Sequence, residues 1–142
     1  MKKSILLSVM MLTVVAFTFT SCNKYDEGSN FSILSAKSRL VNTWKVDKIT
    51  YTNGSSSTST TSDEVLTINK DGSGNASGTT FGIPYSIDGK WAFNSDKTTV
   101  TLTPDNSAYS TETYTIIKLK KDELSLQQID GNTTTRTDFV TK

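Results

Sequence analysis

A period-two alternation of apolar and polar residues runs through most of the chain and is clearest over residues 83–93. Every second residue there is large and apolar apart from one glycine: Ile83, Tyr85, Ile87, Gly89, Trp91 and Phe93. Alternation of this kind gives a β-strand one face on the core and one face in solvent. Gly89 indicates a bend or a turn in this strand, because Asp88-Gly89 is also a hairpin signal.

Shorter segments with the same pattern follow one another, separated by turn residues. We expect about eight strands, over residues 44–51, 65–68, 74–80, 83–93, 99–103, 114–119, 123–127 and 133–140. In the first of them the apolar phase slips by one residue between Val46 and Ile49, as a β-bulge would produce. A meander of this size either stacks as a sandwich or closes into a barrel, and closure removes the exposed edges. The expected fold is therefore all-β: an antiparallel, eight-stranded up-and-down barrel.

Two segments depart from this pattern. Residues 31–41 carry apolar residues near helical spacing, with Ser32 as a candidate N-cap, and predict a short helix ahead of the barrel. The run NGSSSTSTTSD at residues 53–63 contains no apolar residue. We therefore expect it to form a flexible loop between the first two strands.

Residues 1–21 differ in composition from everything that follows. Lys2 and Lys3 precede an uncharged, largely apolar run at residues 5–19, and small residues end it. This order is typical of a secretory signal peptide, which is removed, and the run is too short and wrongly flanked for a good membrane span. Cys22, the only cysteine of the chain, comes directly afterwards.

The arrangement Phe19-Thr20-Ser21-Cys22 resembles the lipobox of bacterial lipoproteins, although Phe19 stands where leucine is usual. The resemblance implies that Cys22 becomes the mature N-terminus, carries acyl chains such as palmitate and anchors the protein to a membrane. The alternative is ordinary signal cleavage that leaves a free cysteine near the terminus. With lipidation, residues 22–37 form a lipidated flexible tether and residues 38–142 form the barrel domain.

Two acidic residues, Asp26 and Glu27, follow the cysteine closely. They resemble the surface-export signal of Bacteroidota lipoproteins, and the equally open alternative is a solvated tether in which the two carboxylates have no role. We expect a protein that is lipid-anchored in the outer membrane, either at the cell surface or on the periplasmic face.

The composition excludes several chemistries. The 142 residues include no histidine and one cysteine, which rules out a Ser-His-Asp or Cys-His site, a His-ligated zinc, a CxxC redox pair and an internal disulfide. A net charge of +1 without a basic block argues against nucleic acid as a partner. The carboxylates fall at turns or strand entries, where turn chemistry explains them: Asp63, Glu64, Asp71, Asp122, Glu123 and Asp130. We therefore expect no catalytic residue, no metal site, no cofactor and no enzymatic activity.

The order of the strand segments resembles that of a known family. The segment LVNTWKV at residues 40–46 resembles the opening strand of lipocalin-like proteins, in which a tryptophan plugs one end of the barrel; here Asn42 replaces the usual glycine. Later segments, at residues 65–74, 89–93, 114–119 and 124–126, resemble lipocalin-like domains of Bacteroidota lipoproteins. The resemblance covers roughly residues 38 to 140. It implies a barrel that holds a small apolar molecule in vertebrate-type relatives and has no agreed ligand in the bacterial branch.

Aromatic residues on the inward phase of such a barrel are candidates for a ligand pocket. We single out Tyr85, Trp91, Phe93 and Tyr114, which offer stacking area and, in tyrosine and tryptophan, a hydrogen-bonding group. The competing interpretation is that they only fill the core, since eight strands enclose a space that side chains can fill. For Trp44 we expect core filling, as an end plug.

The leading hypothesis is a non-enzymatic, membrane-anchored lipoprotein of the cell envelope that binds a small apolar or amphipathic molecule in its barrel. Its rival is a structural or interaction module whose barrel exterior holds a protein or glycan partner in an envelope complex. The two hypotheses differ in whether the barrel interior is hollow and occupied.

Overall fold

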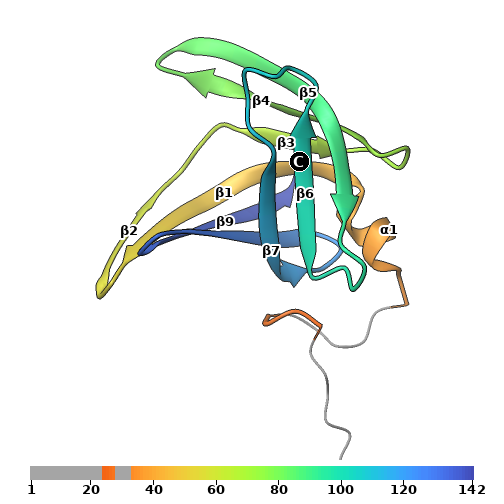
Figure 1. The fold of residues 1–142 in the computed structure, drawn as a ribbon, viewed down its shortest axis with the longest axis horizontal. Helices are drawn as coiled ribbons and strands as arrows, with labels where there is room; N and C mark the ends of the chain where they lie inside the picture. Colours follow the sequence, from red (N-terminus) through yellow and green to blue (C-terminus); the bar gives the residue numbers. More distant parts are fainter. Residues whose placement is uncertain (1–23, 28–32) are drawn as a thin grey trace, which may run out of the picture.

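The computed structural model describes residues 24–27 and 33–142 of the chain. Within these residues, nine strands form one sheet that closes on itself, and one short helix precedes them (Figure 1). The predicted signal peptide and Cys22 lie outside the described residues. The expected all-β fold is confirmed.

Neighbouring strands pair antiparallel, and the last strand returns to pair with the first. In chain order they are β1 (Asn42–Asn53), β2 (Ser56–Thr60), β3 (Val65–Ile68), β4 (Ser73–Thr80), β5 (Ile83–Phe93), β6 (Thr99–Pro104), β7 (Glu112–Leu119), β8 (Glu123–Asp130) and β9 (Thr133–Thr141). The first part of β1 pairs with β3 and its second part with β2, so β2 and β3 share one position beside β1. Pairing of β1 with β9 closes the barrel. The predicted eight-stranded up-and-down barrel is confirmed, because nine strands occupy eight positions.

The predicted flexible loop at residues 53–63 is wrong in its middle part, which forms β2. This strand pairs with β1 in register from Ile49 opposite Thr60 to Asn53 opposite Ser56. All residues of β2 are exposed, so burial does not drive its formation. The long β1 presents an open row of backbone hydrogen-bonding groups, and Ser and Thr side chains suit an exposed edge strand. Gly54 makes the turn between the two strands at a φ of 57°.

The helix is shorter than the one predicted over residues 31–41, and Ser35 rather than Ser32 caps it. This helix, α1 (Ala36–Leu40), begins where the Ser35 Oγ accepts a hydrogen bond from the Ser38 amide at 3.0 Å. Its first and last residues are buried, whereas the two apolar residues before the cap are exposed, so only this turn has an apolar face to bury. The described residues include no helix with the length and apolar character that crossing a membrane requires.

Helix α1 and the start of β1 close one end of the barrel. Leu40 and Trp44 are fully buried, and the indole Nε1 of Trp44 donates a hydrogen bond to the Leu40 carbonyl oxygen at 2.8 Å. Trp44 thus takes the place of the predicted end plug. The core around it includes side chains from several strands: Ile68, Val100, Leu119, Leu124 and Phe139. The turns of the β4–β5 and β8–β9 hairpins lie at the opposite end of the barrel from α1 (Figure 1).

Two local irregularities bear on the predictions for β1 and β5. The register of the β1–β9 pairing shifts between Val46 and Lys48, which confirms the predicted bulge. Strand β5 continues through Gly89, so a hairpin turn at this position is wrong. A Cβ on Gly89 would come within 2.5 Å of the Thr103 carbonyl oxygen. The glycine therefore permits a close approach of β5 to β6.

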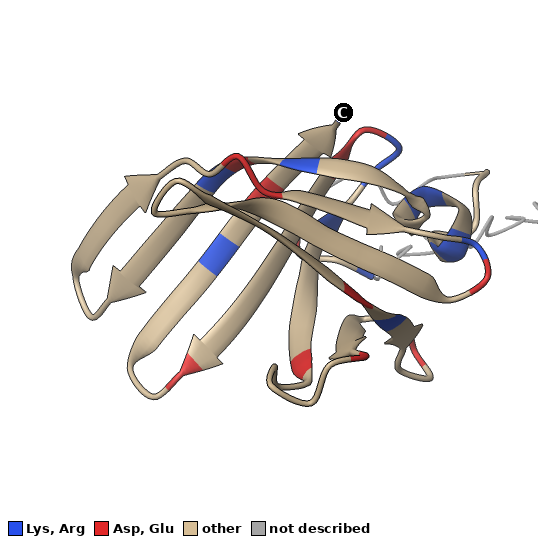
Figure 2. Cartoon of the chain, turned by 90° about the horizontal axis from the view of Figure 1, so that it is seen from above, with Lys and Arg blue, Asp and Glu red and all other residues tan. Residues whose placement is uncertain are grey.

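Charged residues are scattered over the strands, the turns and α1, without a continuous stripe of one sign (Figure 2). The apolar residues that alternate with these polar positions along the strands form the buried core.

Truncating the end plug should destabilise the barrel strongly. We expect Trp44→Ala to lower the free energy of unfolding by about 3–5 kcal/mol, because it leaves a cavity at the closed end. Urea denaturation followed by circular dichroism measures this change. The matched control is Phe81→Ala, which removes a fully exposed ring and should change the same quantity by less than about 0.5 kcal/mol. Equal effects of the two substitutions would contradict the role of Trp44.

Candidate functional site

A pocket of about 240 Å³ lies inside the barrel, bounded by β3 to β7 and by the loop between β6 and β7. Most of its wall is apolar: Leu66, Ile68, Ala76, Ile87, Trp91 and Leu102. The volume is slightly below the roughly 300–1,000 Å³ of pockets for drug-sized ligands, so the pocket suits a small molecule. The interior of the barrel is thus not completely filled by side chains.

Small residues on β4 create this space. The inward positions of β4 are Gly74, Ala76 and Gly78, which lie opposite the inward residues of β3 and β5. A Cβ on Gly74 would approach the Thr67 carbonyl oxygen to 3.0 Å and the Trp91 ring to 3.9 Å. Other strands contribute large side chains to the core, whereas β4 contributes almost none. The space beside β4 is therefore left unfilled.

The structure brings two of the predicted binding residues, Trp91 and Tyr114, into the wall of the pocket. Phe93 lies behind Trp91, with ring centroids 5.4 Å apart and the rings nearly perpendicular, and packs against the core. Tyr85 lies on the same inward phase of β5, but its hydroxyl donates a hydrogen bond to the Glu64 carboxylate at 2.6 Å, outside the pocket wall. The indole Nε1 of Trp91 donates to the Asn69 carbonyl oxygen at 2.8 Å, and the Lys37 Nζ of α1 lies over the ring at 5.8 Å from its centroid.

The pocket has a polar side formed by β7. Glu112 belongs to the pocket wall, and its carboxylate accepts a hydrogen bond from the side-chain amide of Gln128. Among the described residues, the Tyr114 hydroxyl has no hydrogen-bond partner. Burial raises the pKa of Tyr114 to about 12, and the carboxylates of Glu112 and Glu64 add to this effect. The polar side thus offers a protonated hydroxyl and a carboxylate to a ligand.

Glu64 and Glu112 are two inward carboxylates that turn chemistry did not identify. Glu64 had been explained by its position at a strand entry, but its carboxylate turns inward to Tyr85. Burial, followed by this hydrogen bond, raises the pKa of Tyr85. The period-two pattern does indicate that both carboxylates face inward, because Glu64 precedes Leu66 by two residues and Glu112 precedes Tyr114 by two.

A second polar site lies on the outer wall of the barrel, where residues 24–27 contact β7 and β9. The Glu27 amide donates a hydrogen bond to the Ile117 carbonyl oxygen at 2.8 Å, and Glu27 forms an isolated parallel β-bridge with Lys118. Tyr25 is only 8% exposed and packs with the core cluster. Part of the segment predicted as a tether therefore lies against the barrel; residues 22, 23 and 28–32 lie outside the described residues.

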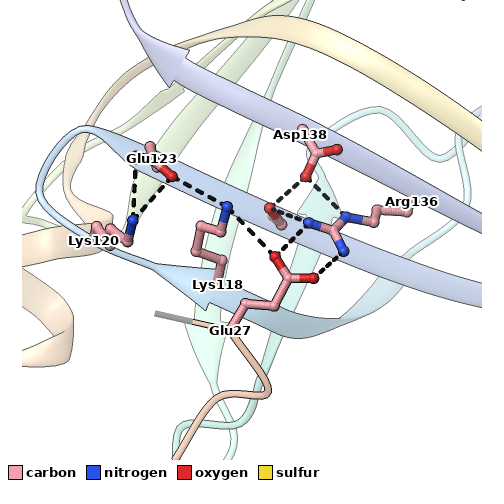
Figure 3. Close-up of polar contacts among 7 residues, drawn as sticks. Glu27, Lys118, Lys120, Glu123, Arg136 and Asp138 are labelled. Atoms are coloured by element: carbon pink, nitrogen blue, oxygen red, sulfur yellow. Dashed lines mark hydrogen bonds and ion pairs between the residues drawn. The ribbon is translucent and has the colours of Figure 1, made fainter. Parts of the chain in front are cut away.

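An ion network holds Glu27 on this wall (Figure 3). The two carboxylate oxygens of Glu27 accept hydrogen bonds from Nη1 and Nη2 of Arg136 at 2.5 and 2.9 Å. The Lys118 Nζ lies 3.4 Å from the same carboxylate, and the Arg136 Nε is 2.9 Å from Asp138. The bidentate hydrogen bonds to Arg136 are the main cause that lowers the pKa of Glu27 to about 2.

The network explains a buried hydroxyl on the outer phase of β8. Ser125 is 1% exposed, although its neighbours Leu124 and Leu126 face the core on the opposite phase. Its Oγ donates to Asp138 at 2.5 Å and accepts from Arg136 at 3.3 Å. This hydroxyl is thus satisfied within the polar site that docks residues 24–27.

Comparison with known proteins agrees with this architecture. The family model of the lipocalin-like domain matches residues 40–126 of the chain. The crystal structure of a lipocalin-like protein from Bacteroides uniformis ATCC 8492 superimposes with a TM-score of 0.54 at 15% sequence identity, and the match covers 73% of this chain and 99% of that chain. At this identity the likeness shows the fold alone. No functionally curated protein matches the chain significantly.

Removing the Arg136 guanidinium should remove the main interaction that lowers the pKa of Glu27. We expect Arg136→Met to raise the pKa of Glu27 from about 2 toward its ordinary value of 4.5, because the bidentate hydrogen bonds disappear. NMR titration of the Glu27 side-chain carboxyl carbon measures this pKa. In the unaltered protein the pKa of the Glu27 carboxyl is lowered. The ionised carboxylate therefore stabilises the docked segment fully above pH 4.5, and this stabilisation is lost as the pH falls toward about 2.

Lys120→Met is the matched control for this titration. Lys120 contacts Glu123 and not Glu27, so its removal should leave the pKa of Glu27 low. A low pKa of Glu27 in the Arg136→Met variant would refute the bidentate hydrogen bonds to Arg136 as the main cause of the lowered pKa.

Proposed function

Because this chain belongs to the lipocalin-like domain family, we propose that its barrel binds a small apolar or amphipathic molecule and catalyses no reaction on it. The single observation that carries the proposal is the pocket of about 240 Å³ inside the barrel. A packed barrel would have no room for a ligand, whereas this one keeps space where β4 contributes only Gly and Ala inward.

The lining of the pocket supports an apolar ligand with one polar end. Leu66, Ile87 and Leu102 line the wall together with the aromatic Trp91, and burial of apolar ligand surface against such a wall contributes roughly 25 cal/mol per Å². The Glu112 carboxylate and the Tyr114 hydroxyl both come from β7, and such a polar pair beside an apolar wall can orient an amphipathic molecule.

A second candidate function is an interaction module that uses the exterior of the barrel. It is favoured by apolar side chains exposed near hairpin turns: Phe81, Ile83 and Ile129. Phe81 is completely exposed and has a positive φ of 51° in the β4–β5 turn. The two hairpin turns lie at the same end of the barrel, and exposed apolar groups there can contact a partner (Figure 1).

Filling the pocket should abolish binding without unfolding the barrel. We expect Ala76→Phe to weaken the binding of octanol, an apolar probe, by more than about tenfold relative to the unaltered chain, measured by isothermal titration calorimetry. Ala92→Phe places the same ring on the exposed, outward phase of β5 and should leave binding unchanged.

The same two variants separate the candidate functions. Native mass spectrometry of the gently purified protein should show a retained small molecule in the unaltered chain and in Ala92→Phe, but not in Ala76→Phe. An empty barrel together with no binding of octanol would overturn the binding function. Loss of a co-purifying protein upon Phe81→Ser would then support the interaction module.

We further propose that Cys22 is acylated and anchors the barrel in the outer membrane, at the cell surface or on the periplasmic face. The order of charge, apolar run and cysteine at residues 2–22 supports this anchor. Three residues of extended chain span at most roughly 11 Å, so docking of Tyr25 on the barrel would keep the domain close to the membrane.

Substituting the anchor residue should release the protein. Cys22→Ala is expected to move the chain from the membrane pellet to the supernatant after cell lysis and ultracentrifugation, because the acyl chains supply the membrane affinity. Ser29→Ala, in the same segment, should leave the protein in the pellet. Continued pelleting of Cys22→Ala would refute lipidation as the anchor, and protease treatment of intact cells distinguishes the two membrane faces.

A further inference from the structure

The polar end of the pocket is built from groups that accept hydrogen bonds or carry negative charge. Glu112 lies opposite Leu102 in the β6–β7 register, so its carboxylate adjoins the apolar wall directly. The Gln128 amide donates to one oxygen of this carboxylate, Oε2. The second oxygen has no hydrogen-bond partner among the described residues. Glu112 is thus held in place and retains the capacity to accept a hydrogen bond from a ligand.

A second carboxylate faces the same interior from the start of β3. The Oε2 of Glu64 accepts a hydrogen bond from the Tyr85 hydroxyl, which also leaves one carboxylate oxygen without a partner in the described part of the chain. The charges of Glu64 and Glu112 both act on Tyr114, whose hydroxyl lacks a partner within the pocket wall. The Tyr114 hydroxyl therefore lies within electrostatic range of two carboxylates that come from different strands.

No described strand supplies a cation that balances these carboxylates from the inside; outside the strands, the Lys37 Nζ of α1 lies over the Trp91 ring, 5.8 Å from its centroid. In the strands that the structure describes, the inward positions include neither Lys nor Arg; the basic strand residues stand on the outward phase: Lys45, Lys48, Lys90, Lys118 and Arg136. Lys90 borders the pocket, but it is exposed and stands between the inward positions Gly89 and Trp91. The interior is therefore negative where it is polar.

We propose that the pocket selects an amphipathic amine: a small apolar body that carries a positively charged, hydrogen-bond-donating head group. This inference rests on the proposed binding function and names its ligand class. The apolar body lies against Leu66, Ile87 and Trp91, and the ammonium head lies between the Glu112 carboxylate and the Tyr114 hydroxyl. A carboxylate head, as in a fatty acid, would bring like charges together in a partly dehydrated space and is disfavoured.

Three ligands that share one alkyl chain length and differ in the head group test the selection for an amine. Octylamine, octanol and octanoate are titrated into the full chain by calorimetry at neutral pH and low salt. We expect octylamine to bind at least about tenfold more tightly than octanoate, with octanol between them. Raising the salt concentration should narrow the difference between the charged ligands, because salt screens the charges.

Isosteric variants assign the preference to the two carboxylates. Glu112→Gln and Glu64→Gln keep an oxygen that accepts from Gln128 or Tyr85, so the fold is retained, and each should reduce the ratio of octylamine to octanoate affinity at least about threefold. Asp47→Asn removes an exposed carboxylate from the bulge in β1 and should leave that ratio unchanged.

Failure of this inference and failure of the binding function give different results. Binding of octanol with no preference for octylamine over octanoate, or a preference that survives both Gln variants, would overturn the amine selection and leave the binding function standing. Binding of none of the three ligands would overturn both. Binding of octylamine that Ala76→Phe does not weaken would place the amine outside the pocket and also overturn the inference.

Discussion

Pairing of β1 with β9 is the constraint on which the rest of the structure depends. It leaves the sheet without free long edges and gives β1 and β3 to β9 one shared interior, which alternate residues of these strands face. A slip of one residue would exchange the inward and outward sets. The bulge between Val46 and Lys48 prevents this, since it keeps both Trp44 and Ile49 on the core although the two residues are an odd number of positions apart.

Closure places two different kinds of polar chemistry on the two sides of one wall. Inside, carboxylates adjoin aromatic and aliphatic side chains in a space that the small residues of β4 leave open. Outside, Arg136 and Lys118 hold Glu27, and the segment at residues 24–27 lies over β7 to β9. The outward phase thus uses its cations to hold the chain's own N-terminal segment, and the inward phase has none among the described strands to neutralise its carboxylates.

Much of the fold could be predicted because period-two alternation is a local property. It located most of the strands and the bulge in β1 and favoured a closed barrel, and a family resemblance added Trp44 as an end plug. It failed for β2, whose residues are all exposed and carry no apolar signal; only the unpaired backbone of β1 makes that strand favourable. The helix was predicted too long, because apolar residues near helical spacing do not reveal which turn finds a surface to pack against.

The sequence by itself determined the strand pattern, the exclusion of histidine chemistry and the set of inward aromatic residues. Tertiary structure alone decided which of those aromatics share a pocket: Trp91 and Tyr114 line it, whereas Phe93 packs behind and Tyr85 pairs with Glu64. It also decided that Glu27 docks on Arg136, 109 positions away in sequence. The physical reason is that periodicity assigns a residue to a face, while the space and the partner it meets there depend on the register of strands distant in the chain.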